Sequence, residues 1–303
     1  MVSVSVPVVG DNHALRADGV TKAYGPEDVV EGASLTVEDG EVLLLMGPNG
    51  VGKTVLLSCL AGATTPDSGD IEVFGQPVAK DRGTHTSFLR QSAMGVDTLS
   101  GREVVALYRD LHPAFTGRWR EYVVDLGIAD ALDKRFEHYS GGMKRKLELA
   151  IALSIDVPIY LLDEPTAGVD LSMVGTFHNA ILDQHDEGKT VVITSHRPAD
   201  AALADRIAFM VDGRVTTVGT PDALTEIVPT VVRITGASTA TEPERHVVGG
   251  TLFHHGAELR GFLDPGATLE TLRETVTRVA PDASVETVAP SYTDVFNYHV
   301  HIA

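Results

Sequence analysis

The sequence predicts an α/β fold built around a mixed β-sheet, followed by a smaller C-terminal α+β unit. Three observations lead to this prediction. Strand-like and helix-like runs alternate over residues 12–225, a glycine-rich loop joins an apolar strand directly to an apolar-faced helix, and the residues beyond about 228 carry strands and a helix of their own. The 303-residue length suits one large domain and a smaller one, and the 43% hydrophobic content suits a packed core.

Charge and cysteine content exclude several functional classes. A formal net charge of −18 disfavours nucleic-acid binding, so we expect no nucleic-acid partner. The single cysteine, Cys59, cannot form a disulfide within the chain and is expected to be buried and reduced. Residues 1–6 lack the basic start of a signal peptide, and no apolar run is long enough to span a membrane, which predicts a cytoplasmic protein.

The first elements are predicted to form an antiparallel β-layer. Residues 14–23 and 33–37 alternate between polar and apolar side chains, and the segment 25–28 between them favours a turn. A second turn at 66–69 precedes another short strand at 70–74.

An apolar strand at residues 42–46 leads directly into the run Gly47-Pro48-Asn49-Gly50-Val51-Gly52-Lys53-Thr54. This spacing is typical of a phosphate-binding loop, in which glycines let successive backbone N–H groups curl around phosphates. An apolar-faced helix begins at Thr54, which completes the strand, loop and helix order that the motif requires. We expect Lys53 to contact the β- and γ-phosphates and the Thr54 hydroxyl to hold Mg²⁺.

The middle of the chain is predicted to be a helical insert between two halves of the sheet. Ser100 and Glu103 form a capping box ahead of an apolar helical face, and further helices are expected at 118–126 and 143–155. Strand character then returns, at residues 159–162, 190–194, 207–211 and 215–218.

Two adjacent carboxylates end the strand at 159–162. Asp163 and Glu164 would point to opposite sides of a regular strand unless the chain turned there, and Pro165 is expected to supply that turn. Asp163 could then hold Mg²⁺ through water, while Glu164 orients or deprotonates an attacking water.

A second anion site is predicted at the start of the helix that follows residue 140. Ser140 suits the N-cap position, and Gly141 and Gly142 leave backbone N–H groups free at the positive end of the helix dipole. A chain with one phosphate loop needs a reason for a second such site.

These motifs, together with Thr194-Ser195-His196, resemble the nucleotide-binding subunit of an ATP-binding-cassette (ABC) transporter, whose fold is a P-loop NTPase cassette with an antiparallel β-layer and a helical subdomain. The resemblance implies that Ser140, Gly141 and Gly142 bind the γ-phosphate of an ATP held by the phosphate loop of another subunit. The ATP-bound state would then be a head-to-tail homodimer, or a pair with a second cassette.

The resemblance also implies roles for four further residues. Tyr24 would stack on adenine, and Gln91 would touch both Mg²⁺ and the attacking water. Asp170 would lie in the loop that crosses the dimer interface, and His196 would be the switch histidine on the γ-phosphate.

The match covers about residues 12–225, so we expect an ATP-binding domain at 1–228, with a helical subdomain at about 92–158, and a C-terminal accessory domain at 229–303. Tyr139 and Met143 depart from the Leu and Gln of the family consensus. The segment at residues 139–143 and the ending at residues 290–296 are similar to the corresponding segments in ATPases of ABC-2 exporters, of the drug and antibiotic self-resistance type.

The resemblance implies an ATPase, with ATP and Mg²⁺ as cofactors, that powers export of a drug, antibiotic or lipid. A transmembrane permease on a separate chain would hold it at the cytoplasmic face of the membrane. Alternatives that stay open are an importer subunit and a soluble ABC ATPase of translation or DNA repair. A GTPase or small-molecule kinase is disfavoured because no Asn-Lys-x-Asp motif is evident and the Ser140 site would be unexplained.

Four tail histidines, His254, His255, His299 and His301, are paired or nearly so. Without evident metal-ligand spacing, we expect them to be exposed to solvent rather than to hold a metal.

Overall fold

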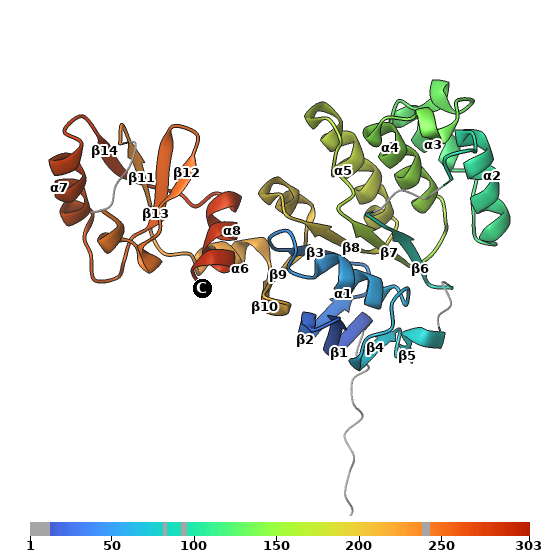
Figure 1. Cartoon of the computed structure of the whole chain (residues 1–303), viewed down its shortest axis with the longest axis horizontal. Coiled ribbons are helices and arrows are strands. Elements are labelled where there is room, and N and C mark those ends of the chain that lie inside the picture. The colour runs from blue at the N-terminus through green and yellow to red at the C-terminus, as the bar shows by residue number, and fades with distance from the viewer. Residues whose placement is uncertain (1–12, 81–83, 92–95, 238–242) are drawn as a thin grey trace, which may run out of the picture.

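The computed structural model describes residues 13–80, 84–91, 96–237 and 243–303 (Figure 1). The amino-terminal segment that we interpret as lacking a signal peptide, and residues 92–95 at the start of the expected helical subdomain, lie outside this range. The described strands form three sheets.

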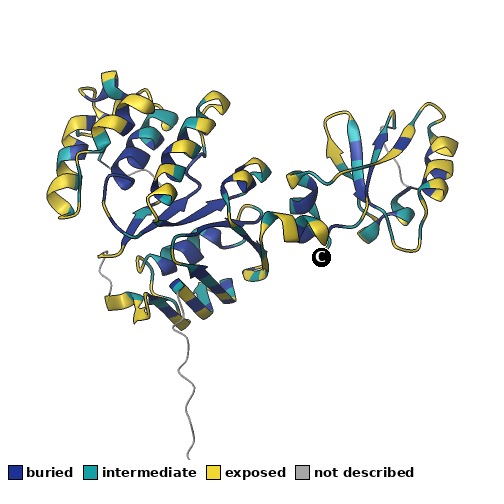
Figure 2. Ribbon diagram, turned by 180° about the vertical axis from the view of Figure 1, so that it is seen from behind, coloured by how far each residue is buried: buried dark blue, intermediate teal, exposed yellow. Residues whose placement is uncertain are grey.

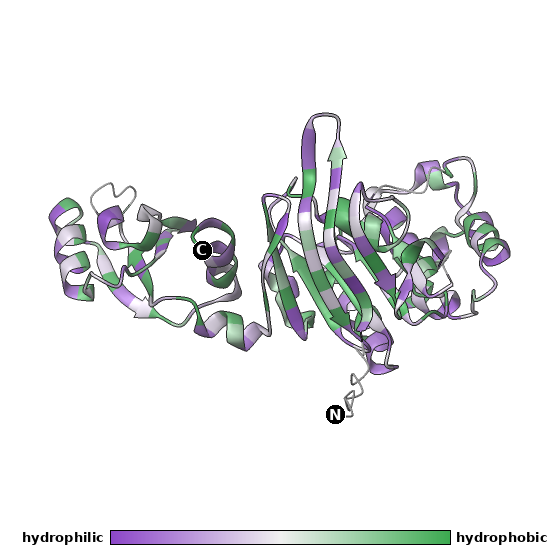
Figure 3. Cartoon of the chain, turned by 90° about the horizontal axis from the view of Figure 1, so that it is seen from below, coloured by the Kyte–Doolittle hydropathy of each residue, from purple (hydrophilic) through white to green (hydrophobic). Residues whose placement is uncertain are grey.

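The predicted antiparallel layer is confirmed. Its strands are β1 (His13–Tyr24), β2 (Glu27–Glu38), β4 (Ser68–Val73) and β5 (Gln76–Pro77), in the order β2-β1-β4-β5. Hydrophobic and hydrophilic residues intermingle along these strands in Figure 3, because one face packs on the core and the other meets solvent. Strand β4, predicted at residues 70–74, ends one residue earlier at Val73, since Phe74 turns with a φ of 47°.

The central sheet carries the functional loops. It contains β3 (Val42–Met46), β6 (Thr86–Leu89), β7 (Ile159–Asp163), β8 (Thr190–Ser195), β9 (Arg206–Val211) and β10 (Arg214–Gly219). The order is β10-β9-β3-β8-β7-β6, parallel except for the edge strand β10, so the predicted mixed sheet is confirmed. Every residue of β3, β7 and β8 is buried, as strands covered on both faces require (Figure 2).

Helices cover both faces of this sheet. Helix α1 (Lys53–Leu60) packs with the antiparallel layer on one face. The other face is covered by residues that include parts of α2 (Gly101–Leu111), α3 (Trp119–Asp125), α4 (Gly141–Ala152) and α5 (Leu171–Asp186). The short 3₁₀ turns are η1 (Val78–Lys80), η2 (Ala129–Ala131), η3 (Phe136–His138), η4 (Pro198–Leu203), η5 (Pro243–His246) and η6 (Val248–Gly250).

Several elements differ from the sequence-based expectation. Helix α4 begins earlier than residue 143, because Ser140 caps it, and ends at Ala152 rather than 155, since Ile155 instead forms an isolated bridge with Phe115. The pattern predicted no element at β6, α5, β12 (Phe253–His255) or α8 (Tyr292–His301). The two strands, β6 with four residues and β12 with three, are too short for a periodicity to be recognised in the sequence.

The C-terminal unit follows α6 (Pro221–Glu226). Its sheet has the antiparallel order β12-β13-β11-β14, with β11 (Val231–Thr235), β13 (Glu258–Phe262) and β14 (Ser284–Val288) beside β12. Helix α7 (Leu269–Val279) packs its apolar residues against β11, β13 and β14. Helix α8 lies between this sheet and the central-sheet part of the molecule (Figure 1). The domain boundary near residue 228 stays a prediction.

Residues 290–296, whose sequence resembles the ending of drug-exporter ATPases, lie at the start of α8, where the C-terminal unit contacts the central-sheet part. Ser291 and Asp294 make a capping box at the start of α8, and Arg260 donates to the Asp294 carboxylate. The rings of Phe296 and Phe209 meet edge to face, 6.3 Å apart, so α8 attaches the tail to strand β9. Among the described helices, none is long and apolar enough to cross a membrane.

Candidate functional site

Four loops meet at one edge of the central sheet. Strands β3, β8, β7 and β6 are neighbours and parallel, so their carboxyl ends lie at the same edge. The phosphate loop follows β3, and His196 follows β8. Asp163 ends β7, Glu164 comes directly after it, and Gln91 follows β6. This edge is where ligands bind in parallel α/β sheets.

The two glycines of the phosphate motif are required by close packing as well as by loop curvature. A Cβ on Gly47 would lie 2.3 Å from the Met210 carbonyl oxygen, and one on Gly52 would lie 2.3 Å from that of Val29. Gly52 also has a φ of 100° and caps α1 without any side-chain hydrogen bond. The first N–H groups of α1 are therefore left to an anion.

Lys53 is held inside its own loop. Its side chain is buried, and Nζ donates to the carbonyl oxygens of Gly47 and Pro48, both at 2.8 Å. Burial lowers the pKa of Lys53, while the charges of Glu164 and Asp163 act in the opposite direction. The ammonium group is thus fixed beside the N–H groups of the loop, where a phosphate would meet both.

The Asp163 carboxylate has one satisfied and one unsatisfied oxygen. Oδ1 accepts hydrogen bonds from Thr194 Oγ1 at 2.5 Å and Thr54 Oγ1 at 3.2 Å. Oδ2 is buried and has no hydrogen-bond partner within the described part of the chain. A buried carboxylate oxygen beside a threonine hydroxyl provides the hard oxygen ligands that Mg²⁺ prefers, so these residues fit the predicted metal.

The turn after β7 is made by Glu164 itself. Its φ of 45° is left-handed, which costs a residue with a side chain about 1–2 kcal/mol. The expectation that Pro165 supplies the turn is therefore corrected by one residue. The Glu164 N–H donates to Thr194 Oγ1 at 2.9 Å, which ties the turn to strand β8.

This turn brings together the three residues predicted to be catalytic. His196 Nδ1 lies 3.1 Å from Glu164 Oε1, and Gln91 Nε2 donates to Glu164 Oε2 at 3.4 Å. Glu164 is only 8% exposed, whereas the His196 side chain is 39% exposed. A buried carboxylate held by two flanking side chains has the geometry of a general base.

The other predicted site residues are at the surface. Ser140 caps α4, as expected, through a hydrogen bond from Met143 N to its Oγ at 3.2 Å, and Gly141 and Gly142 follow in the first turn. The exposed Tyr24 ends β1, and the exposed Asp170 is the N-cap residue of α5 but makes no side-chain capping bond. Their assigned contacts with ATP stay predictions.

Sequence reasoning missed a buried carboxylate behind the site. Asp200 in η4 is 1% exposed and accepts from Ser195 Oγ at 2.6 Å, while His178 Nε2 of α5 lies 2.9 Å away. Thr166 Oγ1 donates to it at 3.4 Å. Burial acts to raise the pKa of Asp200, but the hydrogen bonds from His178 and Ser195 outweigh it and the pKa is lowered. Asp200 thus joins the segments that carry Glu164 and His196.

Arg145 of α4 was also missed, although the sequence holds a signal for it. Positions 145, 148, 149 and 152 share one helical face, and that face is buried. An arginine on the buried face of a helix needs polar partners in the interior.

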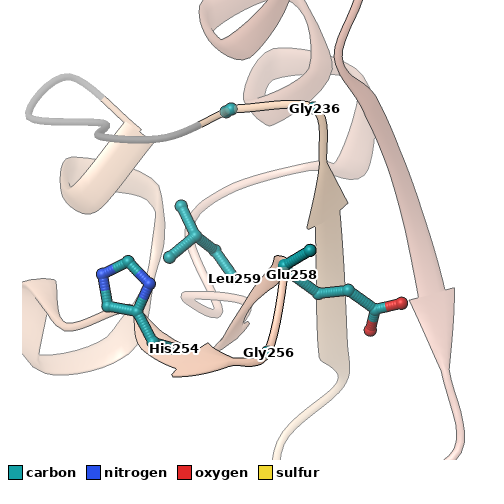
Figure 4. Close-up of a pocket in the computed structure, with 7 residues that line it drawn as sticks. Gly236, His254, Gly256, Glu258 and Leu259 are labelled. Atoms are coloured by element: carbon teal, nitrogen blue, oxygen red, sulfur yellow. The ribbon is translucent and has the colours of Figure 1, made fainter.

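The tail histidines behave differently from one another. His254, His255 and His301 are exposed, as expected, but His299 is 4% exposed and stacks on Phe209 at 4.9 Å, which corrects the expectation for that residue. His254 lines a hollow of about 390 Å³ at the β12–β13 turn, and Figure 4 shows its ring pointing away from the Glu258 carboxylate. Within the described ranges, no group of three or more His, Cys, Asp or Glu side chains is arranged to hold a metal ion.

Comparisons with known proteins point to one family. The ABC transporter family model matches residues 30–167. The daunorubicin resistance ATP-binding protein DrrA3 of Streptomyces coeruleorubidus is 35% identical over 219 residues, which cover 70% of this chain and 69% of the relative. The Nod factor export ATP-binding protein I of Rhizobium sp. (strain N33) is also 35% identical, over 70% of this chain and 73% of the relative.

Solved structures share the fold. The dimeric structure of the bacterial ABC transporter cassette MJ0796 superposes with a TM-score of 0.62 at 24% identity, covering 68% of this chain and 98% of the cassette. The same cassette in a dimeric post-hydrolysis state, bound to ADP and phosphate, gives the same TM-score.

Proposed function

The chain belongs to the ABC transporter family as an ATP-binding and ATP-hydrolysing subunit, and we propose that it powers the export of a drug, antibiotic or lipid. The relatives named for drug resistance and for Nod factor export support the direction of transport and the small-molecule cargo. A separate membrane-spanning chain would form the path and would hold this subunit at the cytoplasmic face of the membrane.

One observation carries the catalytic part of the proposal. Glu164, His196 and Gln91 follow three different strands, yet their side chains meet. His196 Nδ1 lies 3.1 Å and Gln91 Nε2 lies 3.4 Å from the Glu164 carboxylate. Such convergence at the carboxyl edge of a parallel sheet is expected of a reaction centre.

The three residues would divide the work of hydrolysis. Glu164 accepts a proton from the attacking water, whose oxygen forms the new bond to the γ-phosphorus as the bond to the β-phosphate oxygen breaks, giving ADP and phosphate. His196, hydrogen-bonded to Glu164 through Nδ1, leaves its other ring nitrogen for the γ-phosphate. Gln91 helps to orient the water.

Binding would be shared between the phosphate loop and the metal site. Lys53 and the free N–H groups at the start of α1 hold the phosphates. Thr54, Asp163 and Gln91 would hold Mg²⁺, which neutralises the negative charge that develops on the phosphates.

A second cassette would complete each site. Ser140, Gly141 and Gly142 of one copy would cap the γ-phosphate held by the other, with Asp170 at the interface and Tyr24 stacked on adenine. The exposure of Tyr24, Ser140 and Asp170 supports this assignment, because residues that close a site between subunits must be accessible in one chain alone.

The transport proposal is tested by placing the full chain in inside-out vesicles together with a candidate membrane-spanning partner chosen from the genes adjacent to its own. We expect ATP-dependent uptake of a drug, antibiotic or lipid and stimulation of ATP turnover by the same compound, both lost in Glu164→Gln. ATP-dependent movement in the opposite direction would identify an importer. ATP turnover unchanged by the membrane protein would reject a transport role.

A further inference from the structure

Arg145 makes an unusual set of contacts behind the catalytic turn. It lies about one turn after Gly141, the first residue of α4, and is 5% exposed. Its Nη2 donates to the carbonyl oxygens of Asp163 and, at 3.0 Å, of Glu164, and its Nε donates to that of Pro165 at 3.2 Å. One guanidinium therefore binds three successive carbonyl groups at the end of β7.

These three carbonyl groups converge because of the turn at Glu164. In a regular strand successive carbonyls point in alternating directions, so one side chain could not reach three in a row. The left-handed backbone of Glu164, with its φ of 45°, breaks that alternation. The arrangement that Arg145 binds is thus the same one that aims the Glu164 carboxylate at His196 and Gln91.

The same guanidinium reaches the second catalytic loop. Nη1 donates to the Arg90 carbonyl oxygen at 2.7 Å, and the next residue is Gln91, whose amide contacts Glu164. Nη1 also lies 3.4 Å from the carboxylate of Glu148, one turn further along α4. From helix α4, Arg145 therefore binds the backbone of Glu164 and also that of Arg90, the residue before Gln91.

That helix begins at Ser140, which is proposed to cap the ATP of the opposite subunit. Ser140 and Arg145 are joined by a continuous run of helix with no break. If the start of α4 moves when it caps ATP, Arg145 would therefore move with it and shift the backbone of the Glu164 turn. Burial lowers the pKa of Arg145, and a guanidinium placed there at such a cost suggests a role beyond packing.

We propose that Arg145 is a positioning residue for ATP hydrolysis, which fixes the left-handed turn of Glu164 and links it to the helix that caps ATP across the dimer. The proposal rests on the ATPase function above. It does not make Arg145 a catalytic residue, since its hydrogen bonds to described residues go to backbone carbonyls and to Glu148.

The test uses Arg145→Lys and Arg145→Gln in the full chain. Lysine keeps the charge near Glu148 but cannot bind four carbonyl groups, and glutamine removes the charge. We expect kcat for ATP to fall by about ten-fold or more, while KM and the Kd for a fluorescent ATP analogue change by less than about three-fold. An effect on folding alone would instead reduce the amount of active protein and leave kcat per folded molecule unchanged.

Arg206→Gln is the matched control. Its guanidinium also pairs with a largely buried carboxylate, Glu41, and donates to a backbone carbonyl, that of Thr36, but it begins strand β9 and so lies at the opposite edge of the sheet from the catalytic loops. We expect this variant to lose stability without losing kcat. Equal losses of kcat in Arg206→Gln and the Arg145 variants would overturn the proposal.

Amide hydrogen exchange gives a second readout that needs no turnover. The Glu164 N–H donates to Thr194 and the Ala167 N–H donates to the Glu164 carbonyl, so both report on the turn. In Arg145→Lys we expect faster exchange in the peptide 160–170 and no change in α1. If Arg145→Gln does not fold, the kcat and the amide hydrogen exchange of Arg145→Lys alone test the proposal. Unchanged exchange at the turn together with a wild-type kcat rejects the positioning role.

Failure of the ATPase function would look different. In that case Glu164→Gln would hydrolyse ATP as the wild-type chain does, or neither would, whatever the exchange data for Arg145→Lys show. Failure of the Arg145 proposal alone leaves the Glu164→Gln defect in place.

Discussion

Buried polar side chains serve different purposes in the nucleotide-binding part and in the C-terminal unit. In the first, Lys53, Asp163 and Asp200 converge on loops at one edge of the sheet, and Asp163 Oδ2 has no partner among the described residues. In the tail, Asp294 caps its own helix and pairs with Arg260, and Thr275 donates to the carbonyl one turn before it.

The difference lies in what the polar groups are placed beside, because Arg260 Nε and His299 Nδ1 of the tail are also buried without a hydrogen-bond partner in the described part of the chain. The Asp163 carboxylate lies beside Thr54 of the phosphate loop, where a ligand can reach it, whereas the Asp294 carboxylate stabilises the start of its own helix. A polar atom kept dry and unsatisfied raises the energy of the protein until a ligand meets it, whereas a satisfied cap lowers that energy at once. Changes in the first region should therefore alter binding and turnover, and changes in the second should alter stability. Four predictions test that division.

The largest effect is expected for Glu164→Gln. The amide cannot accept the proton of the attacking water, so kcat should fall by about 100-fold or more while ATP binding and the ATP-bound dimer persist. Steady-state turnover and size-exclusion chromatography with ATP measure both properties. The control is Glu286→Gln in the tail, whose carboxylate pairs with Arg233 at the surface and should leave kcat unchanged. Normal hydrolysis by Glu164→Gln would remove Glu164 from its assigned role.

Lys53→Ala should act on binding rather than on the chemical step. Loss of a charged hydrogen-bond donor to the phosphates corresponds to about a 10- to 100-fold rise in the Kd for ATP. Titration with a fluorescent ATP analogue measures this change, with Lys189→Ala, whose exposed partner Asp156 lies away from the loops, as the control. An unchanged Kd in Lys53→Ala would contradict the phosphate-loop assignment.

Deleting residues 229–303 should reduce stability but spare nucleotide binding. Helix α8 covers Phe209, and its removal exposes this ring together with Ala201 and Leu203, which belong to the same core. We expect a loss of about 3 kcal/mol, comparable with removal of one large core side chain. Urea unfolding and ATP titration of the truncated chain check this.

Phe296→Ala is the milder companion variant, since it trims the same contact while leaving the tail in place. It should lower stability by less than the deletion and leave kcat unaltered. A truncated chain that does not fold would show that the two parts form one cooperative unit.

The smallest effect concerns acid and His299. Burial lowers the pKa of this ring below 6.5, although its hydrogen bond to the Leu224 carbonyl acts in the opposite direction. The neutral ring is favoured in the folded state, so stability is complete above pH 6.5 and declines as the pH falls from 6.5 towards the lowered pKa.

Replacing His299 by Phe keeps the stacking on Phe209 and removes the titration. Between about pH 7.5 and pH 5.5 the wild-type chain should lose about 2–4 °C more in Tm than His299→Phe does. Identical Tm losses in the two proteins would mean that this ring does not report on the contact between α8 and β9.

The sequence determined the parts of this protein that depend on local spacing. The phosphate loop, the Ser100–Glu103 capping box, the Ser140 cap and the apolar strands of the central sheet all follow from residues within a few positions of one another. Each of these features depends on short-range hydrogen bonding or on periodicity, so the amino-acid sequence alone was enough to predict it.

The tertiary structure decided which distant groups meet. The burial of Arg145 against four carbonyl groups, the joining of three segments by Asp200, and the stacking of His299 on Phe209 each depend on partners far away in the chain. The turn at Glu164 rather than at Pro165 belongs to the same class, since Thr194 and Arg145 hold it from other elements. Such contacts exist only after the sheet has been assembled, because the free energy that buries a charge or holds a left-handed residue comes from the surrounding fold.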